Sequence, residues 1–386
     1  MRLSMISAAL VAALVGYGST IALVLAAAAA VGATPEQTTS WVLAICLAKA
    51  IGSAVLSWWN RVPVVLAWST PGAALIAATT GVSMGEAVGA FLLAAALIAA
   101  TALIRPLGRA VAAIPDGIAA AMLAGVLLPF CLKGMAAAQA APLLVLPMVA
   151  LFLLVRLANP ALAVLAALAL GLALAFGSGA AVWPALTLAL PAPVLIAPEG
   201  SVAALIGLGV PLYLVTMASQ NLPGFATMRA HGFAPPVARA LGVTGGISAL
   251  AALFGAHTVN MAAITAAICM GEDVHPDRDQ RWKVGLAYGG VWVLLGLFSP
   301  AILALLAALP GEVMGALVAL ALLAPLTGAL TGSFTAPDTR FAATVTLAVS
   351  GAGVAALGIG GAFWGLLAGL AVWGLERLRD ARRSKG

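Results

Sequence analysis

The amino-acid sequence predicts an all-α polytopic membrane protein with fourteen transmembrane segments in two inverted sets of seven. Three observations lead to this fold class. Of the 386 residues, 63% are hydrophobic and only 8% are charged, whereas about a quarter of the residues in a soluble domain are charged. Apolar runs long enough to cross a hydrocarbon core of roughly 30 Å recur along the whole chain. Basic residues gather in alternate breaks between these runs, as membrane topology requires.

The apolar segments follow one another with short polar, Pro-containing or Gly-containing breaks. The first run follows Arg2 and exceeds the roughly 7–15 apolar residues of a signal peptide, so we interpret it as a membrane helix. The expected spans of the first half are 7–31, 39–58, 62–80, 87–104, 116–133, 141–157 and 160–177. Those of the second half are 201–222, 236–254, 256–271, 282–306, 311–329, 339–355 and 358–376.

Lys and Arg indicate the orientation of the chain, because cytoplasmic loops carry an excess of basic residues. If residue 1 is cytoplasmic, all but two of the 18 basic residues fall on the cytoplasmic side. The exceptions are Lys133, outside the membrane, and Lys49, within it. An odd number of spans would destroy this bias, so the sequence predicts an even number and cytoplasmic termini.

An internal repeat is expected from the position of a Pro-rich stretch near residues 178–200, which has no basic residue. This stretch separates residues 1–200, with seven spans, from residues 201–386, with another seven. Because seven is odd, the two halves must have opposite orientations, as in many transporters. A pair of Gly/Pro-interrupted helices at matching places in the halves indicates the binding site in such proteins.

The third and tenth spans form such a pair. Each opens with an extended stretch, reaches a polar cluster and continues as a short Ala-rich helix. Ser69 to Gly72 are expected to form the cap and first turn of the short helix in the third span. His257, Thr258 and Asn260 are expected to hold the same place before the short helix of the tenth. Helix starts inside a membrane have unpartnered N–H groups and a partial positive charge, which favours binding of an anion. The alternative is a pair of ordinary helix kinks.

Five stretches resemble the BenE family of bacterial benzoate/proton symporters. They are AWSTPGAAL (67–75), MASQNLPG (217–224), GAHTVNMAAITAAIC (255–269), HPDRDQRW (275–282) and GIGGAFWGLLAGL (358–370). The resemblance implies the uracil-permease type of fold, with short β-strands before the half-helices of spans 3 and 10. It implies a core of spans 1–4 and 8–11 that moves against a gate of spans 5–7 and 12–14. It also implies proton-coupled uptake of an aromatic carboxylate such as benzoate across the bacterial inner (plasma) membrane.

The same resemblance implies a substrate site between the third and tenth spans, beside the first and eighth. Carried over position by position, its residues are Tyr17, Ser19, Thr20, Ser69, Thr70, Gly72, Ser219, Gln220, Asn221, His257 and Asn260. Nucleobase permeases have carboxylates in their eighth and tenth spans, where this sequence has neutral side chains. A carboxylate would repel an anionic substrate, so its absence favours an organic anion over uracil or xanthine.

His257 and Lys49 are the ionisable residues expected at membrane depth, where such groups are functional candidates. Either side chain is a candidate for carrying the coupled proton. The alternative for His257 is a neutral imidazole that caps backbone groups. Lys49 is also a candidate for lying in a wet crevice, for binding the substrate, for staying neutral because burial disfavours its charge, or for a structural bond to backbone carbonyls. Tyr17 and Trp68 are candidates for stacking on an aromatic ring, or for ordinary packing.

The sequence has no pattern of metal ligands or catalytic residues, so we expect no metal, no cofactor and no enzyme activity. The expected partners are a small anion, a proton and the lipid bilayer, but no nucleic acid, and a homodimer is left open. The alternative functions are a uniporter, exchanger or channel for other small organic or inorganic anions, or a nucleobase/proton symporter.

Overall fold

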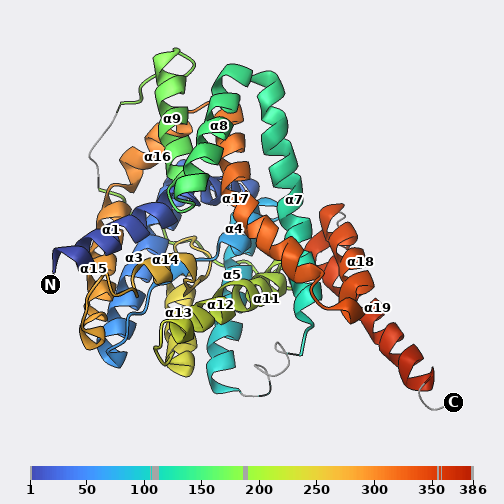
Figure 1. Ribbon diagram of the computed structural model, residues 1–386. Helices are drawn as coiled ribbons and strands as arrows, with labels where there is room; N and C mark the ends of the chain where they lie inside the picture. The colour runs from blue at the N-terminus through green and yellow to red at the C-terminus, as the bar shows by residue number, and fades with distance from the viewer. Residues whose placement is uncertain are drawn as a thin grey trace.

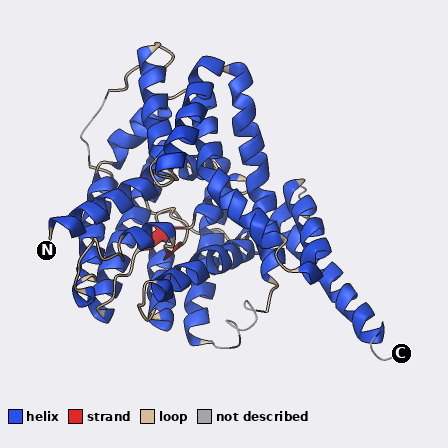
Figure 2. Cartoon of the chain, viewed as in Figure 1, coloured by secondary structure: helices blue, strands red, loops and turns tan. Residues whose placement is uncertain are grey.

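The chain forms a bundle of helices around one short pair of strands in the computed structural model (Figure 1). The structure describes residues 2–104, 106, 113–185, 190–353, 356–357 and 359–383. The described part is mostly helical, as the sequence predicts. Figure 2 shows the two strands enclosed by helices, so the non-helical backbone is covered by protein.

Elements of the first half follow the expected order of spans. They are α1 (Leu3–Gly18), α2 (Ile21–Ala30), α3 (Pro35–Asn60), β1 (Leu66–Trp68), α4 (Thr70–Ala77), α5 (Met84–Leu103), α7 (Asp116–Ala140), α8 (Pro142–Ala158) and α9 (Ala163–Gly177). The first span is interrupted at Ser19 and Thr20 instead of continuing from 7 to 31. α3 begins earlier than expected because Thr34 and Gln37 form a capping box, in which each side chain accepts the other's backbone N–H.

The second half contains more irregular helix than the first. Its elements are α10 (Val202–Ala204), η1 (Leu205–Gly209), α11 (Val210–Thr216), η2 (Met217–Asn221), α12 (Leu222–Ala230), α13 (Val237–Ala252), β2 (Val259–Met261), α14 (Ile264–Ile268), η3 (Arg278–Gln280), α15 (Lys283–Leu297), α16 (Ser299–Ala307), α17 (Gly311–Ser333), η4 (Pro337–Thr339), α18 (Arg340–Gly351) and α19 (Gly361–Arg383). η1 and η2 are π-helical turns, and η3 and η4 are 3₁₀ turns. The helix of the eighth span extends to Ala230, beyond the expected end at 222.

Several helices have the length and composition of membrane spans. Within the described residues, six are long and apolar enough to cross a bilayer. A seventh is obtained if residues Arg278–Leu297 and Ser299–Ala307, bent by 57° at their junction, form one span. α8, α9 and α13 are shorter apolar helices. The count of fourteen spans therefore stays a prediction.

The helices pack in two groups. α7, α8, α9, α17, α18 and α19 pack mainly on one another, and α1, α3, α5, α13 and α15 do the same. Glycines allow neighbouring helices to approach closely inside both groups. This is expected in a membrane, where lipid supplies no hydrophobic driving force for the association of helices. A Cβ at Gly134 of α7 would collide with the Gly315 carbonyl of α17, and one at Gly245 of α13 would lie 2.6 Å from the Ala99 nitrogen of α5.

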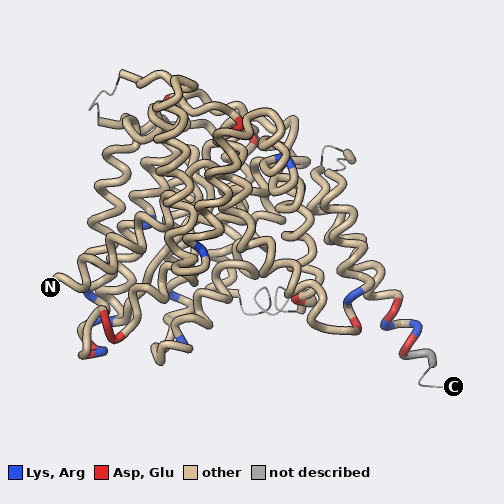
Figure 3. The backbone as a smooth tube through the Cα atoms, turned by 45° about the horizontal axis from the view of Figure 1, so that its top comes forward, with Lys and Arg blue, Asp and Glu red and all other residues tan. Residues whose placement is uncertain are grey.

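Charged residues gather toward the two ends of the bundle (Figure 3). Lys and Arg are most frequent at the lower end in that view, where many Asp and Glu residues and the C-terminus also lie, whereas the upper end carries few basic residues. Such a separation is what the positive-inside rule requires of a polytopic protein. The assignment of the Lys- and Arg-rich end to the cytoplasm stays a prediction.

Candidate functional site

Two segments far apart in the sequence meet at the strand pair inside the bundle. β1 and β2 are antiparallel. The pairing continues beyond the strands, because Ser69 N–H donates to Thr258 O (3.1 Å) and Ala262 N–H donates to Val65 O (2.9 Å). A bilayer offers no water to extended backbone, so these two segments satisfy each other's polar groups.

α4 starts directly after β1, at a capped turn. Ser69 Oγ accepts a hydrogen bond from Gly72 N–H (3.1 Å), and Pro71 occupies a first-turn position that needs no N–H donor. The Thr70 hydroxyl lies 3.3 Å from the hydroxyl of Thr20, which is located in the break between α1 and α2. The start of α4 therefore faces the interruption of the first span.

Thr216, the last residue of α11, connects both strand segments through its hydroxyl. Its Oγ1 donates to Ser69 Oγ (3.1 Å) and lies 2.9 Å from Thr258 Oγ1. All three side chains are fully buried, and buried hydroxyls need such partners to offset their desolvation. Thr216 is not among the residues selected from the sequence. Its position four residues before Gln220, on the same face of the helix, is the signal that could have found it.

The polar residues of the eighth span lie in η2, and π-helical turns of this kind are frequent at functional sites. Asn221 Oδ1 accepts a hydrogen bond from Met261 N–H (3.0 Å), which holds β2 against η2. Gln220 Oε1 accepts one from Asn260 Nδ2 (3.3 Å). Within the described residues, Asn260 Oδ1 is buried without a partner. In the same part of the chain, half-buried Ser219 makes no side-chain hydrogen bond.

The tenth span differs from the arrangement expected from the third. His257 and Thr258 precede β2 and Asn260 lies within it, whereas the short α14 follows only after an N-cap at Ala263. The polar residues therefore lie before the second short helix, but they do not adjoin it as Ser69 and Thr70 adjoin α4. The reason is the strand pairing, because Asn260 is in register with Ala67 and its backbone must be extended.

His257 is fully buried with both ring nitrogens engaged. Its Nδ1 accepts a hydrogen bond from Trp41 Nε1 (3.0 Å), an atom that can only donate. The ring proton must then lie on Nε2, which donates to the Ser69 carbonyl oxygen (3.2 Å). This geometry assigns a neutral imidazole and favours the backbone-capping interpretation, while a role in proton transfer stays a prediction.

Lys49 lies in an aromatic cage with 1% of its surface exposed. Its Nζ is 3.9 Å from the ring centre of Trp68 and 2.9 Å from that of Trp292, as in cation–π contacts. Tyr17 packs on both tryptophans, with ring centres 5.7 and 5.9 Å away. Within the described residues, Tyr17 Oη and Trp292 Nε1 are buried without partners, and Lys49 has no ion pair.

The site carries no negative charge. All 12 acidic residues lie in the described part of the chain, and none of them is buried. No group of three His, Cys, Asp or Glu side chains that could hold a metal is found in that part either. The arrangement therefore offers hydroxyl, amide and amine groups to a ligand, but no carboxylate.

The model of the family described as benzoate membrane transport protein, BenE, matches residues 1–375. The chain belongs to the BenE family. This confirms the resemblance found in the sequence and makes the chain a membrane transporter rather than an enzyme. It is 39% identical to the inner membrane protein YdcO of Escherichia coli over 363 residues, which are 94% of this chain and 93% of that protein. It is 34% identical to the benzoate membrane transport protein of Acinetobacter baylyi over 369 residues, 95% of this chain and 94% of that one.

Solved structures show that this BenE chain shares its fold with more distant proteins. The overall structure of SLC26A9 aligns with a TM-score of 0.67 and 13% identity over 97% of the chain, which spans 66% of that protein. The transmembrane domain of the cyanobacterial bicarbonate transporter BicA aligns with a TM-score of 0.62 and 14% identity, covering 96% of this chain and 98% of that one.

Apart from Ser219, the residues selected from the sequence separate into three sets in this BenE family member. Thr20, Thr70, Ser69, His257, Gln220 and Asn260 come together around the strand pair, with Ser19 beside Thr20 at 3.4 Å between hydroxyls. Tyr17 and Lys49 both contact the ring of Trp68, the residue directly before Ser69. Asn221 supports β2, and Gly72 has a packing role, because a Cβ there would lie 2.5 Å from Leu212 Cδ1.

Proposed function

We propose that this chain carries a small aromatic carboxylate, such as benzoate, into the cell together with a proton. The observation that carries the proposal is the buried cluster around β1 and β2, which combines hydroxyl, amide and ammonium groups with no carboxylate. A carboxylate ligand has only acceptor oxygens, so donors of this kind suit it. The relative named as a benzoate membrane transport protein supports the aromatic acid as substrate.

The proposed position of the carboxylate is among Thr20, Thr70, Gln220 and Asn260. These side chains come from four segments that would have to separate slightly to admit it, because Thr20 and Asn260 are 4% and 0% exposed. The aromatic ring of the substrate would then lie toward the Tyr17 and Trp68 rings. Lys49 behind them supplies a positive charge that no acidic side chain of the described chain neutralises.

We propose that residues 1–200 and 201–386 are inverted repeats of seven spans each. Spans 1–4 and 8–11 would form a core that moves against a gate of spans 5–7 and 12–14. The separation of the helices into two packing groups supports this division, because α7, α8, α9, α17, α18 and α19 are the helices of the proposed gate. The shared fold with SLC26A9 and BicA is compatible with it.

Proton coupling has an electrostatic reason. Moving one negative charge into a cell against a potential of 100 mV costs about 2.3 kcal/mol, and one accompanying proton removes that cost. His257 is the first candidate for the proton. Protonation of Nδ1 would place two donors opposite each other at Trp41, so it would open a contact between α3 and the segment before β2. Lys49 is the second candidate.

Substitutions around the strand pair test the site. Thr70→Ala, Gln220→Ala and Asn260→Ala each remove one potential partner of the carboxylate, and Ser69→Ala removes the cap that positions Thr70. A hydrogen bond to a charged group contributes about 1.5–3 kcal/mol, so equilibrium binding of benzoate to the purified protein should weaken by about tenfold or more in the variants that lose such a bond. Thr327→Ala on α17, whose hydroxyl bonds only to its own helix at Leu323 O, is the matched control. Unchanged affinity in all four variants would place the site elsewhere.

The substrate class is tested in proteoliposomes loaded with the purified protein. Uptake of labelled benzoate should rise when the outside is made more acidic, and unlabelled benzoate should inhibit it far better than benzamide, which has the same ring without the charge. Uracil should not compete. Electrical current carried by chloride or benzoate alone, without a proton gradient, would instead indicate a channel.

A further inference from the structure

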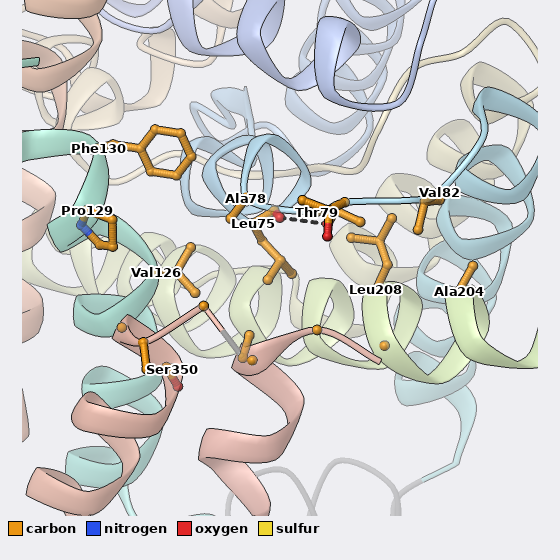
Figure 4. A pocket seen from close by; sticks show the side chains of 18 of the residues that line it. Leu75, Ala78, Thr79, Val82, Val126, Pro129, Phe130, Ala204, Leu208 and Ser350 are labelled. Atoms are coloured by element: carbon orange, nitrogen blue, oxygen red, sulfur yellow. Dashed lines mark hydrogen bonds between the residues drawn. The ribbon is translucent and has the colours of Figure 1, made fainter. Parts of the chain in front are cut away.

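A cavity of about 350 Å³ lies at the other end of α4 from Ser69 and Thr70 (Figure 4). One wall is formed by the C-terminal end of α4 and by α10 and η1, and the facing wall by α7 with the ends of α18 and α19. This volume is within the range of roughly 300–1,000 Å³ that is usual for small-ligand sites. In the proposed division of the chain, the cavity lies on the boundary between core and gate.

The sequence explains why this space stays open. Pro129 interrupts the backbone hydrogen bonds of α7 beside the cavity. Glycines at 207, 351, 353, 360 and 361 line the walls without contributing side chains. Apolar groups of Leu75, Val126, Phe130 and Leu208 cover much of the rest, as Figure 4 shows. The cavity can therefore accept an apolar ring or chain with little rearrangement.

Lys133 is the only charged residue among the described residues that line the cavity. The Lys133 side chain is exposed, and it lies on the side of the protein opposite the proposed cytoplasmic side. The carbonyl of Leu75, near the negative end of α4, already accepts a hydrogen bond from Thr79 Oγ1 (3.0 Å), drawn as a dashed line in Figure 4. An apolar cavity with a single cation is complementary to an amphipathic monoanion.

We infer that this cavity is a second binding site, for an aromatic or aliphatic monocarboxylate, and that its occupancy slows transport. The inference rests on the proposed movement of core against gate. A ligand that touches both walls binds the arrangement seen here and not one in which the walls have moved apart. It therefore stabilises this arrangement by RT ln(1 + [L]/Kd) and hinders the exchange between states.

The test is equilibrium binding of labelled benzoate to the purified full-length protein, compared with uptake into proteoliposomes over a wide range of benzoate concentration. The wild type should show two classes of site, and uptake should rise and then fall as the weaker class fills. Lys133→Gln and Phe130→Ala should each weaken binding at the weaker class by about tenfold, the loss expected for one charge-assisted hydrogen bond or one aromatic contact. Both variants should also abolish the decrease in uptake at high benzoate concentration. Lys133→Arg should retain both the weaker class of site and the decrease in uptake at high benzoate concentration.

Leu132→Ala is the matched control, because Leu132 neighbours Lys133 on α7, is 63% exposed and does not line the cavity. Thr70→Ala separates this inference from the proposed function. If Thr70→Ala leaves both classes intact while Lys133→Gln removes one, the cavity binds the anion but the proposed transport site is wrong. A single class of site in the wild type, or two classes that Lys133→Gln and Phe130→Ala leave unchanged, would overturn the inference.

Discussion

Thr216 contributes one hydroxyl to both strand segments of the site, and its replacement by Val keeps the shape while removing that hydroxyl. The hydrogen bonds to Ser69 and Thr258 are then lost. Because a typical buried hydrogen bond contributes about 0.5–1.5 kcal/mol, benzoate affinity should fall by up to about tenfold in equilibrium binding. Thr327→Val, at an exposed position of α17, should leave it unchanged. Equal affinities for both variants would mean that the hydroxyl network does not position the ligand.

Lys49 brings an amine to the site that has no acidic side chain beside it in the described part of the chain, and we propose that it acts there in its charged form. Lys49→Met keeps most of the length of the side chain and removes the charge. Benzoate binding should weaken by about tenfold or more, while inhibition by the neutral benzamide should change little, so that the preference for the charged ligand decreases. Lys283→Met is the control, since Lys283 lies at the start of α15 and bonds to Gln280. A preference for benzoate as strong as in the wild type would exclude Lys49 from anion selection.

His257 is the first candidate for carrying the coupled proton, and its substitution tests this role. If His257 carries it, His257→Gln should keep part of the benzoate binding, because Gln can still donate to the Ser69 carbonyl, while uptake should lose its dependence on an imposed pH gradient. The measurement is the ratio of uptake with and without the gradient in proteoliposomes. A ratio equal to that of the wild type would remove His257 from the mechanism, and Lys49→Met would then be assayed in the same way.

The two strand-containing segments determine the shape of the site, and at Gly72 α4 packs closely against Leu212 of α11. A Cβ at this position would lie 2.5 Å from Leu212 Cδ1 and 2.7 Å from Ser69 Oγ. Overpacking of this kind costs roughly 1–3 kcal/mol, so Gly72→Ala should lower the unfolding temperature in detergent and weaken benzoate binding. Gly290→Ala in α15 is the control, because a Cβ there meets nothing within 4 Å. A variant as stable as the control would show that α4 can shift without consequence.

Elements of this protein were predictable from sequence to different degrees. Ser69 and Pro71 have strong local signals, since a cap followed by proline specifies the start of a helix, and α4 begins between them. Asn260 has no such signal. Its extended conformation depends on pairing with Ala67, nearly two hundred residues away, and a single sequence does not report that contact. The same holds for η2, because a π-helical turn depends on packing more than on residue type.

The whole molecule was easier to predict than its site. Its class follows from composition, because 8% charged residues cannot cover a soluble protein of this size. The order of the helices follows from the spacing of apolar runs, although broken helices such as α1 and α2 and the bent pair α15 and α16 make the number of spans harder to count. Thr216 shows why the site was harder, because its partners come from distant segments that only the folded chain brings together.

The central claim, that an aromatic carboxylate binds where the two strand segments pair, is tested most directly by locating a heavy-atom ligand. A structure of the purified protein with 4-bromobenzoate, determined from the anomalous signal of bromine, would show the ligand without assumptions about transport. We expect its carboxylate within hydrogen-bond distance of Thr70 and Asn260 and its ring toward Tyr17 and Trp68. Bromine found only in the cavity beside Lys133, or nowhere near the strands, would contradict the claim.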